Sequence, residues 1–253
     1  MKLLSEKVAI VTGASSGIGR AAASLFARQG ARVVVGARRA GALEQLTDEI
    51  TRAGGDAIAL AGDVTSEEYV RALVRCALQR YGRLDVAFNN AGMLGNATSA
   101  PDLSREEWTR IVDTNLTSGF LCAKHQLPAL LETGGSLIFT SSFVGVTIGM
   151  PQTPAYSATK AGLVGLSKAL AAEYGPQGVR VNALLPGGTE TSMAGEFGDS
   201  PEVVEFVNNI HALKRRAQPE EIAQAALFLA SDMSSFVTGT AMLADGGVSI
   251  AKT

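Results

Sequence analysis

The sequence has almost no excess of charge of either sign: 22 lysines and arginines stand against 24 aspartates and glutamates, a formal net charge of −2. Because both signs are interspersed, neither a nucleic-acid-binding face nor a basic membrane-binding face is expected. Apolar runs long enough to span a bilayer are missing. The first six residues, MKLLSE, lack the apolar core of a signal peptide. We therefore expect a soluble, cytoplasmic protein.

Cysteine and histidine are also scarce, with two residues of each. Cys76 and Cys122 both fall in segments with helical patterns, and they do not form a metal-binding or redox motif. We therefore expect two buried thiols in a reducing compartment and no metal site.

What the sequence does contain is a repeated alternation of short apolar runs and helix-like segments. Such β-branched runs are typical of parallel strands that are buried on both faces. The expected strands are residues 7–12, 33–35, 57–61, 84–88, 136–140, 180–184 and 241–243; the expected helices are 20–29, 42–52, 67–81, 108–131, 156–172 and 220–230, with an irregular stretch before the last helix. The pattern predicts one α/β domain over residues 1–253, a doubly wound Rossmann fold with a seven-stranded parallel sheet and helices on both faces.

The first strand runs directly into a glycine-rich segment, TGASSGIG, at residues 12–19. Glycines at a strand–helix junction permit a tight turn and a close approach of the backbone to a diphosphate. The free amides and the dipole at the N-terminus of the following helix attract the negative charge of such a group. A glycine-rich turn can also be a plain connection, but its place at the first junction favours nucleotide binding.

The segment GASSG, residues 13–17, also fits the Gly-x-Ser-x-Gly nucleophile elbow of α/β-hydrolases. A hydrolase needs a histidine within reach of that serine, and only His125 and His211 exist, neither with an obvious acidic partner. An elbow on the first strand also leaves no earlier loop to complete an oxyanion hole. We rank a hydrolase well below a nucleotide-binding protein.

An acidic residue is missing after the second strand, where folds that use NAD carry one for the ribose 2′-hydroxyl. The strand is followed instead by Arg38 and Arg39. A guanidinium can hold a 2′-phosphate through two charge-assisted hydrogen bonds. The sequence therefore favours NADP(H) over NAD(H), which stays possible, since the arginines could also be solvated residues at the start of a helix.

Tyr156 and Lys160 begin a helical pattern four residues apart, so their side chains are expected on one helix face. A phenol with an ordinary pKa near ~10 is a poor proton shuttle at neutral pH, and a nearby cation favours its phenolate. The pair could therefore exchange a proton with a carbonyl or an alcohol oxygen. Taken alone, the two residues could equally lie on the surface of an ordinary helix.

Together these motifs resemble the short-chain dehydrogenase/reductase family, in the expected order and over nearly the whole chain. The segments that carry the resemblance are the loop 12–19, Asp63-Val64, NNAG at 89–92, Asn115, SSFVG at 141–145, YSATK at 156–160 and Pro186-Gly187. The resemblance implies four catalytic residues, Asn115, Ser142, Tyr156 and Lys160. It implies cofactor contacts at Gly13, Ser15, Ser16, Gly17, Ile18, Gly19, Arg38, Arg39, Asp63, Val64, Asn90, Ala91, Gly92, Tyr156, Lys160, Pro186, Gly187, Thr189 and Thr191.

The implied reaction is reversible hydride transfer between NADP(H) and a secondary alcohol or ketone of small size. In the implied mechanism Tyr156 handles the proton and Ser142 holds the carbonyl oxygen. Lys160 lowers the pKa of the tyrosine and binds the nicotinamide ribose, and Asn115 holds a water that links Lys160 to solvent. The resemblance also implies a homotetramer that packs through the long central helix and the Tyr156 helix.

One departure from the family pattern is visible between Ser142 and Tyr156, where the chain is one residue longer than in a typical member. The extra residue falls in the loop 149–154, so it affects the substrate pocket. It also leaves open whether Ser141 or Ser142 is the catalytic serine. We choose Ser142 because the segment Phe-Val-Gly follows it, as x-x-Gly follows the family's serine.

The substrate is the least determined feature. We expect its pocket at Met93 and Leu94, at residues 143–154 and at a flexible lid of residues 189–213. The large apolar residues of these segments, some of which could be core, are Met150, Met193, Phe197 and Phe206. They favour an apolar or cyclic carbonyl compound.

Two alternatives remain. An acyl-carrier-protein ketoreductase of the same family would use a basic docking patch, for which residues 214–216 are candidates. A dinucleotide-binding sensor or scaffold without turnover would not need the tyrosine, lysine, serine and asparagine set.

Overall fold

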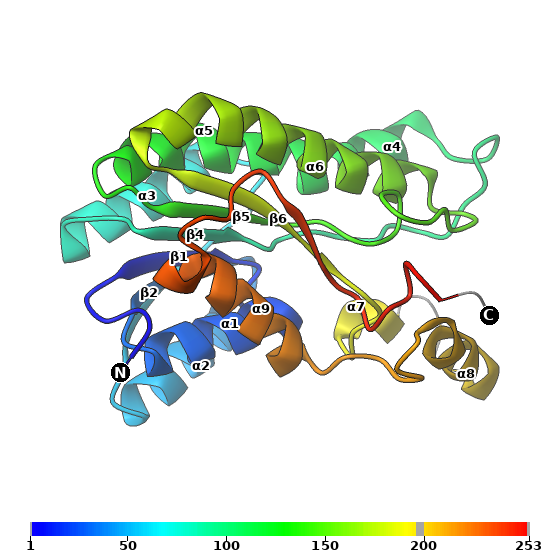
Figure 1. Cartoon of the computed structure of the whole chain (residues 1–253), viewed down its shortest axis with the longest axis horizontal. Helices are drawn as coiled ribbons and strands as arrows, with labels where there is room; N and C mark the ends of the chain where they lie inside the picture. The colour runs from blue at the N-terminus through cyan, green and yellow to red at the C-terminus, as the bar shows by residue number, and fades with distance from the viewer. Residues whose placement is uncertain (1, 196–199, 252–253) are drawn as a thin grey trace.

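The computed structural model describes residues 2–195 and 200–251, and the predicted seven-stranded parallel sheet is confirmed (Figure 1). The strand order is β3-β2-β1-β4-β5-β6-β7. The strands are β1 (Val8–Thr12), β2 (Arg32–Ala37), β3 (Asp56–Ala61), β4 (Val86–Asn89), β5 (Ser136–Thr140), β6 (Arg180–Pro186) and β7 (Ala241–Ala244). Their bounds lie within a few residues of the predicted runs.

Helices cover both faces of the sheet, as predicted (Figure 1). One layer holds α1 (Gly17–Arg28), α2 (Ala40–Arg52) and α9 (Pro219–Ala230); the other holds α3 (Glu67–Tyr81), α4 (Arg105–Val112), α5 (Ser118–Leu131) and α6 (Pro154–Tyr174). Two further helices, α7 (Ser192–Gly195) and α8 (Pro201–Ile210), lie beyond the end of β6. None of the helices in the described ranges is long and apolar enough to cross a membrane.

The central strands are apolar throughout because each of their faces is covered by helices. Successive side chains of a strand point to opposite faces. In β2, Val33 and Val35 belong to the core beside α1 and α9, whereas Val34 belongs to the core beside α3 and α5. All three valines are fully buried, because their side chains alternate between two cores and not between a core and solvent.

The order of the strands reverses between β1 and β4, since the chain proceeds outward from β1 through β2 and β3 before it returns to β4 on the other side. Helices on opposite faces leave a crevice at the carboxyl ends of the strands at such a switch point. Ligands of open α/β sheets bind in that crevice, so the fold locates the candidate site before any side chain is considered.

The stretch before α9, expected to be irregular, is so only in part, because helix α8 forms within it. The side chain of Ser200 accepts a hydrogen bond from the backbone N–H of Val203, and Pro201 occupies the first turn. Both features stabilise a helix start. Valines at 203, 204 and 207 and Ile210 supply an apolar stripe at helical spacing, a signal that the sequence did contain.

The helix predicted over residues 108–131 begins earlier, at Arg105, where the side chain of Ser104 accepts from the N–H of Glu107. It is interrupted by a π-helical turn at Asp113–Thr117. π-Turns within α-helices are frequent at functional sites. This one contains Asn115.

Candidate active site

A cleft of about 790 Å³ opens at the carboxyl ends of β1 to β6. It brings together segments that are far apart in the sequence. The predicted residues that line it are Gly13, Ser15, Ser16, Gly17, Ile18, Arg38, Arg39, Asp63, Val64, Asn90, Ala91, Gly92, Ser142, Tyr156, Lys160, Pro186, Gly187, Thr189 and Thr191. Two further predicted residues, Gly19 and Asn115, are not part of the lining and lie behind it.

The glycine-rich loop after β1 is shaped by two residues with positive φ, Gly13 at +66° and Gly17 at +53°. A Cβ atom on Gly13 would lie 2.9 Å from the Cα of Ala91, and one on Gly17 would lie 2.9 Å from a methyl carbon of Thr191. A side chain at either position would therefore be strained and would also push apart the walls of the cleft.

The N-terminus of α1 faces the cleft without a capping group of its own. Ser16, the N-cap residue, makes no side-chain cap hydrogen bond, and the first turn contains no acidic residue. Free amides and an uncompensated helix dipole attract an anion. The loop therefore fits the diphosphate of a dinucleotide, with room for it and donors to hold it.

Arg39 lies across the glycine-rich loop. Its Nη2 donates hydrogen bonds to the Oγ of Ser15 at 3.0 Å and to the Oγ of Ser16 at 2.8 Å. Arg38 lines the cleft beside it, and both arginines are exposed. Two cations thus stand at the end of β2, where the adenosine half of a dinucleotide binds in this fold.

Tyr156, Ser142 and Lys160 converge at the other end of the cleft. The Nζ of Lys160 lies 5.5 Å from the centre of the Tyr156 ring and donates a hydrogen bond to the backbone oxygen of Thr140 at 2.8 Å. The side chain of Ser142 hydrogen-bonds to the Tyr156 hydroxyl. A phenol, a hydroxyl and a cation therefore occupy one corner of the cleft, with Ser142 and Lys160 buried.

Ser141 and Ser142 differ clearly in their contacts. The Oγ of Ser141 donates to the backbone oxygen of Lys160 at 2.6 Å, which ties the end of β5 to α6. The Oγ of Ser142 accepts from the N–H of Val144 at 3.1 Å and is turned to Tyr156. The geometry favours Ser142 as the serine with a chemical role.

Burial changes the ionisation of both titratable groups in this corner. It raises the pKa of Tyr156, and the hydrogen bond from Ser142 opposes that change. Burial also lowers the pKa of Lys160 to about 8. In this structure the pKa of the phenol therefore lies above its usual value and not nearer neutrality as predicted, because burial disfavours the phenolate.

Asn115 buttresses this corner from behind. Its Oδ1 accepts from the N–H of Met93, and its Nδ2 donates to the backbone oxygen of the same residue, both at 2.8 Å. A Cβ atom on Gly92 would lie 3.2 Å from Asn115 Oδ1 and 3.3 Å from Lys160 Nζ. The amide thus fixes the segment that follows β4 against the lysine.

The wall opposite the glycine-rich loop is mostly apolar. It includes residues of all three segments that were expected to form the pocket. The anticipated ones are Met93, Leu94, Phe143, Val144, Met150, Met193, Val203, Val204, Val207 and Ile210; those that the sequence reasoning missed are Gly95, Asn96, Arg110 and Thr114. Phe206, which was expected in the pocket, is 59% exposed and does not line it. Phe197 and Gly198, which were assigned to the lid, lie outside the described residues.

A family model described as enoyl-(acyl carrier protein) reductase matches residues 13–249. Cyclohexanol dehydrogenase of Acinetobacter sp. (strain SE19) is 40% identical over 241 residues, covering 95% of this chain and 94% of that protein. A-factor type gamma-butyrolactone 1′-reductase (1S-forming) of Streptomyces virginiae is 42% identical over 252 residues, covering 98% and 97%. The crystal structure of a short-chain type dehydrogenase/reductase from Mycobacterium marinum has a TM-score of 0.92 at 37% identity, covering 98% and 97%.

The chain belongs to the short-chain dehydrogenase/reductase family. It is therefore an oxidoreductase that acts on CH–OH groups with a nicotinamide dinucleotide, NAD(H) or NADP(H). Its relatives are named as dehydrogenases and reductases, which argues against a sensor or scaffold without turnover.

The histidines of this short-chain dehydrogenase/reductase also argue against a hydrolase. The expectation that neither has an acidic partner is wrong for His125, whose Nε2 lies 2.8 Å from a carboxylate oxygen of Glu67, on α3. His125 does not line the cleft, however. His211 is buried with both ring nitrogens engaged by backbone groups. Neither histidine is placed to activate Ser15.

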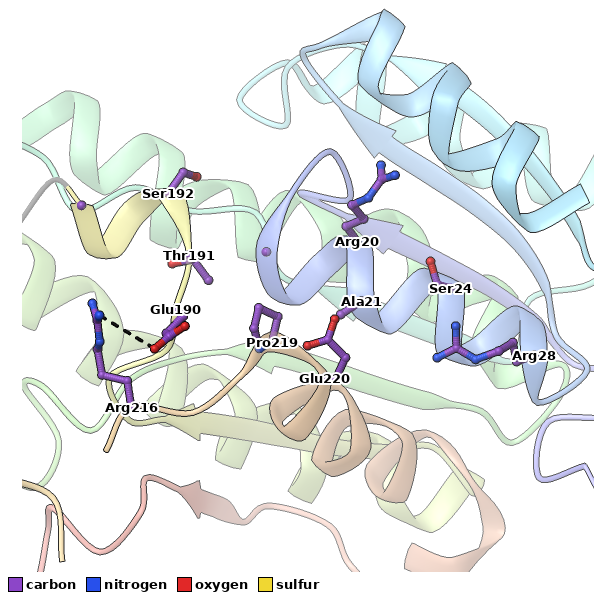
Figure 2. Close-up of a pocket in the computed structure, with 12 residues that line it drawn as sticks. Arg20, Ala21, Ser24, Arg28, Glu190, Thr191, Ser192, Arg216, Pro219 and Glu220 are labelled. Carbon is purple, nitrogen blue, oxygen red and sulfur yellow. Dashed lines mark ion pairs between the residues drawn. The ribbon is translucent and has the colours of Figure 1, made fainter. Parts of the chain in front are cut away.

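A second hollow of about 700 Å³ adjoins the dinucleotide cleft of this family member and shares Gly17, Thr191, Ser192 and Arg216 with it (Figure 2). It lies between α1, the N-terminus of α9 and the segment after β6. Both signs of charge line it, from Arg20, Arg28, Arg216, Glu190 and Glu220. Because these walls carry opposite charges side by side, the hollow favours neither an anion nor a cation.

Proposed function

We propose that this enzyme interconverts an apolar, cyclic secondary alcohol and its ketone, with a preference for NADP(H) over NAD(H). The observation that carries the proposal is the meeting of Ser142, Tyr156 and Lys160 in one corner of a cleft whose far wall is apolar. The uncapped end of α1 supports dinucleotide binding at the other end of the same cleft.

The dinucleotide, when bound, supplies the hydride. The glycine-rich loop and the N-terminus of α1 would bind its diphosphate, and Asp63 and Val64, which line the cleft, would hold the adenine side. Pro186 and Gly187 would hold the nicotinamide side, where Thr189 and Thr191 could supply hydroxyls. The proton chemistry falls to α6 and the end of β5.

In the direction of reduction, the Tyr156 hydroxyl donates its proton to the carbonyl oxygen of the substrate. Burial raises the pKa of Tyr156, so the phenol carries that proton at neutral pH. Ser142 holds the same oxygen through a hydrogen bond and shares its developing charge. Lys160 stabilises the phenolate that remains, and Asn115 keeps the lysine and its water route in place.

The substrate class follows from the apolar wall and from the relatives. Methionines 93, 150 and 193 and the valines of α8 line the wall and can follow the outline of an alicyclic ring. Cyclohexanol dehydrogenase, whose name denotes a cyclic alcohol, is among the relatives, and so is a reductase whose name denotes a gamma-butyrolactone, another small ring. These observations support a ring-bearing secondary alcohol or ketone.

The test is a substrate panel run with NADPH and with NADH. We expect oxidation of NADPH with cyclohexanone and substituted cyclohexanones, and slow or no turnover of an acetoacetyl thioester. Absence of turnover with every cyclic ketone and alcohol would refute the substrate class. Preferential turnover of the thioester would favour the acyl-carrier-protein ketoreductase instead.

The basic residues 214–216 lend little support to that alternative. Arg215 forms two 2.7 Å hydrogen bonds with Glu221, and the Nζ of Lys214 donates to the backbone oxygen of Asn209 at 2.7 Å. Arg216 lies 3.9 Å from Glu190. Each cation is directed to a group of its own chain rather than presented to an acidic partner.

Replacing Arg38 and Arg39 together by alanine is expected to lower the ratio of kcat/KM for NADPH to kcat/KM for NADH at least about tenfold. The reason is the loss of charge-assisted hydrogen bonds to the 2′-phosphate, each of which contributes about 1.5–3 kcal/mol. Steady-state kinetics with both dinucleotides measures the ratio. Arg52→Ala, an exposed arginine at the end of α2, is the matched control. An unchanged ratio in the double variant would remove the basis for NADP(H) preference.

Two further features belong to the proposal. The predicted lid, of which the structure describes residues 189–195 and 200–213, includes α8 as its helical part beside the substrate end of the cleft. The chain assembles as a homotetramer, since Ala158, Ala161 and Gly165 form a small, exposed face of α6 that permits close helix packing. A solution mass of a single 26.2 kDa chain would contradict the assembly.

A further inference from the structure

His211 is a buried histidine that the reaction as described above does not use. It ends helix α8 and is 1% exposed. Its Nδ1 lies 2.6 Å from the backbone oxygen of Val207, and the N–H of Gly188 donates to its Nε2 at 2.9 Å. Because a carbonyl can only accept and an amide N–H can only donate, the ring is neutral with its proton on Nδ1.

The two hydrogen bonds join two different walls of the cleft. Val207 lies on α8 and lines the substrate side, while Gly188 follows β6 and lines the side of the Pro186-Gly187 turn. The carbonyl of Val207 is among the last four of its helix, and the N–H of His211 bonds instead to Asn208. The imidazole therefore supplies the partner that this carbonyl otherwise lacks.

The space around the ring is closely filled. A Cβ atom on Gly188 would lie 2.9 Å from His211 Cε1, and one on Gly246 would lie 3.2 Å from His211 Cδ2. The ring also meets Phe143 edge-on, with 6.3 Å between ring centres. The imidazole is thus held on three sides and cannot turn to exchange its partners.

We propose that His211 is a positioning residue that couples the substrate-side helix α8 to the cofactor-side turn at Gly188. This role rests on the proposed function, because it assigns the two walls to substrate and dinucleotide. The His211 ring bridges Val207 and Gly188, and it thereby fixes the distance between the apolar stripe of α8 and the nicotinamide side of the cleft. Binding of dinucleotide against the turn is thereby transmitted to α8.

Two substitutions separate the two hydrogen bonds. In His211→Gln, the side-chain oxygen can reach the position of Nε2 and accept from Gly188. In His211→Asn, the shorter amide can occupy the position of Nδ1 and donate to Val207, but it leaves the Gly188 N–H without an acceptor. An unpartnered buried donor shifts an equilibrium about tenfold or more. The asparagine variant should therefore be the more severely affected of the two.

The first measurement separates KM from kcat. We expect His211→Asn to raise KM for cyclohexanone about tenfold while the Kd for NADPH, measured by fluorescence titration, changes less than about threefold. His211→Gln should stay within about threefold of the original enzyme in both. His125→Asn, which removes the other histidine outside the cleft, is the matched control and should leave both constants unchanged. Equal effects of the asparagine and glutamine variants on KM would overturn the coupling through Gly188.

The second measurement does not depend on turnover. Hydrogen exchange of residues 201–210 should slow when NADPH binds to the original protein, and it should respond much less in His211→Asn. An equal response in both would overturn the proposal even if the enzyme accepts cyclic ketones. Conversely, absence of turnover with the ketone panel would refute the proposed substrate class while leaving the exchange result interpretable. If His211→Asn does not fold, His211→Gln decides: retained NADPH-dependent protection supports the link, and lost protection overturns it.

Discussion

Replacing Tyr156 by phenylalanine is expected to lower kcat about 10³-fold while leaving the Kd for NADPH within about twofold. A positioned acid or base contributes typically 10²- to 10⁴-fold to a rate, and the Tyr156 hydroxyl is the group that lies beside Ser142 in this corner of the cleft. Without that hydroxyl, the substrate oxygen keeps the hydrogen bond from Ser142 but loses its direct proton donor.

Binding and folding should survive that substitution. The Tyr156 ring packs against the small apolar cluster of Phe143, Val144 and Val248, and phenylalanine preserves those contacts. Single-turnover kinetics with NADPH and a cyclic ketone measures the chemical step, and fluorescence titration measures binding. Tyr174→Phe, at the far end of the same helix, is the control and should behave like the original enzyme. Substantial turnover by Tyr156→Phe would disprove the acid/base assignment.

Replacing Lys160 by methionine is expected to have opposite effects on turnover and on stability. Turnover should fall by at least about 10²-fold, since the phenolate loses its neighbouring cation. The cofactor-free protein should become more stable. A charged lysine that is 4% exposed and has a pKa of about 8 instead of 10.5 destabilises the fold by roughly 3 kcal/mol. Loss of the hydrogen bond to Thr140 reduces this gain in unfolding free energy by about 1 kcal/mol.

The pH dependence of the stability gain in Lys160→Met tests the sign of that gain independently. Between pH 8 and 10.5 the unfolded chain keeps the lysine proton that the folded chain has already lost, so the penalty is complete below pH 8 and disappears toward pH 10.5. A net gain of about 2 kcal/mol corresponds to a rise in Tm of about 4–8 °C at pH 7. The gain should shrink steadily as pH rises from 8 to 10.5.

Thermal unfolding of the cofactor-free proteins at pH 7, 9 and 10 measures this gain. Lys168→Met, an exposed lysine on the same helix, should show no comparable gain at any of these values. A lower Tm for Lys160→Met than for the original protein at pH 7 would show that the buried ammonium does not destabilise the fold.

The parts of the fold and the site that sequence reasoning predicted are those encoded locally. Valine-rich runs such as β2 and the loop 12–19 carry their signals in neighbouring residues, so their order along the chain predicted the sheet and the crevice at its edge. Helical spacing predicted that Tyr156 and Lys160 share one helix face, and the family resemblance assigned that face to the cleft, where both residues lie.

What the sequence did not predict depends on three-dimensional surroundings. The sign of the pKa change at Tyr156 is set by how much of the chain buries the phenol, which no spacing reports. The partner of His125 comes from a different helix, and both contacts of His211 are backbone groups with no sequence signature. Helix α8 is the exception: its cap and apolar stripe are local, and they were overlooked.

Arg39 donates hydrogen bonds to Ser15 and Ser16, and these bonds bear on the selectivity for the cofactor. A free surface arginine carries about 2 kcal/mol of rotamer entropy that it must give up to grip a phosphate. Here the guanidinium is already tethered to two hydroxyls before any ligand arrives, so part of that loss is incurred during folding. If the enzyme prefers NADP(H) as proposed, its discrimination between the two dinucleotides then depends on the serines as well as on the cation. A chain with the same arginine but alanines at 15 and 16 would keep the charge and discriminate less sharply.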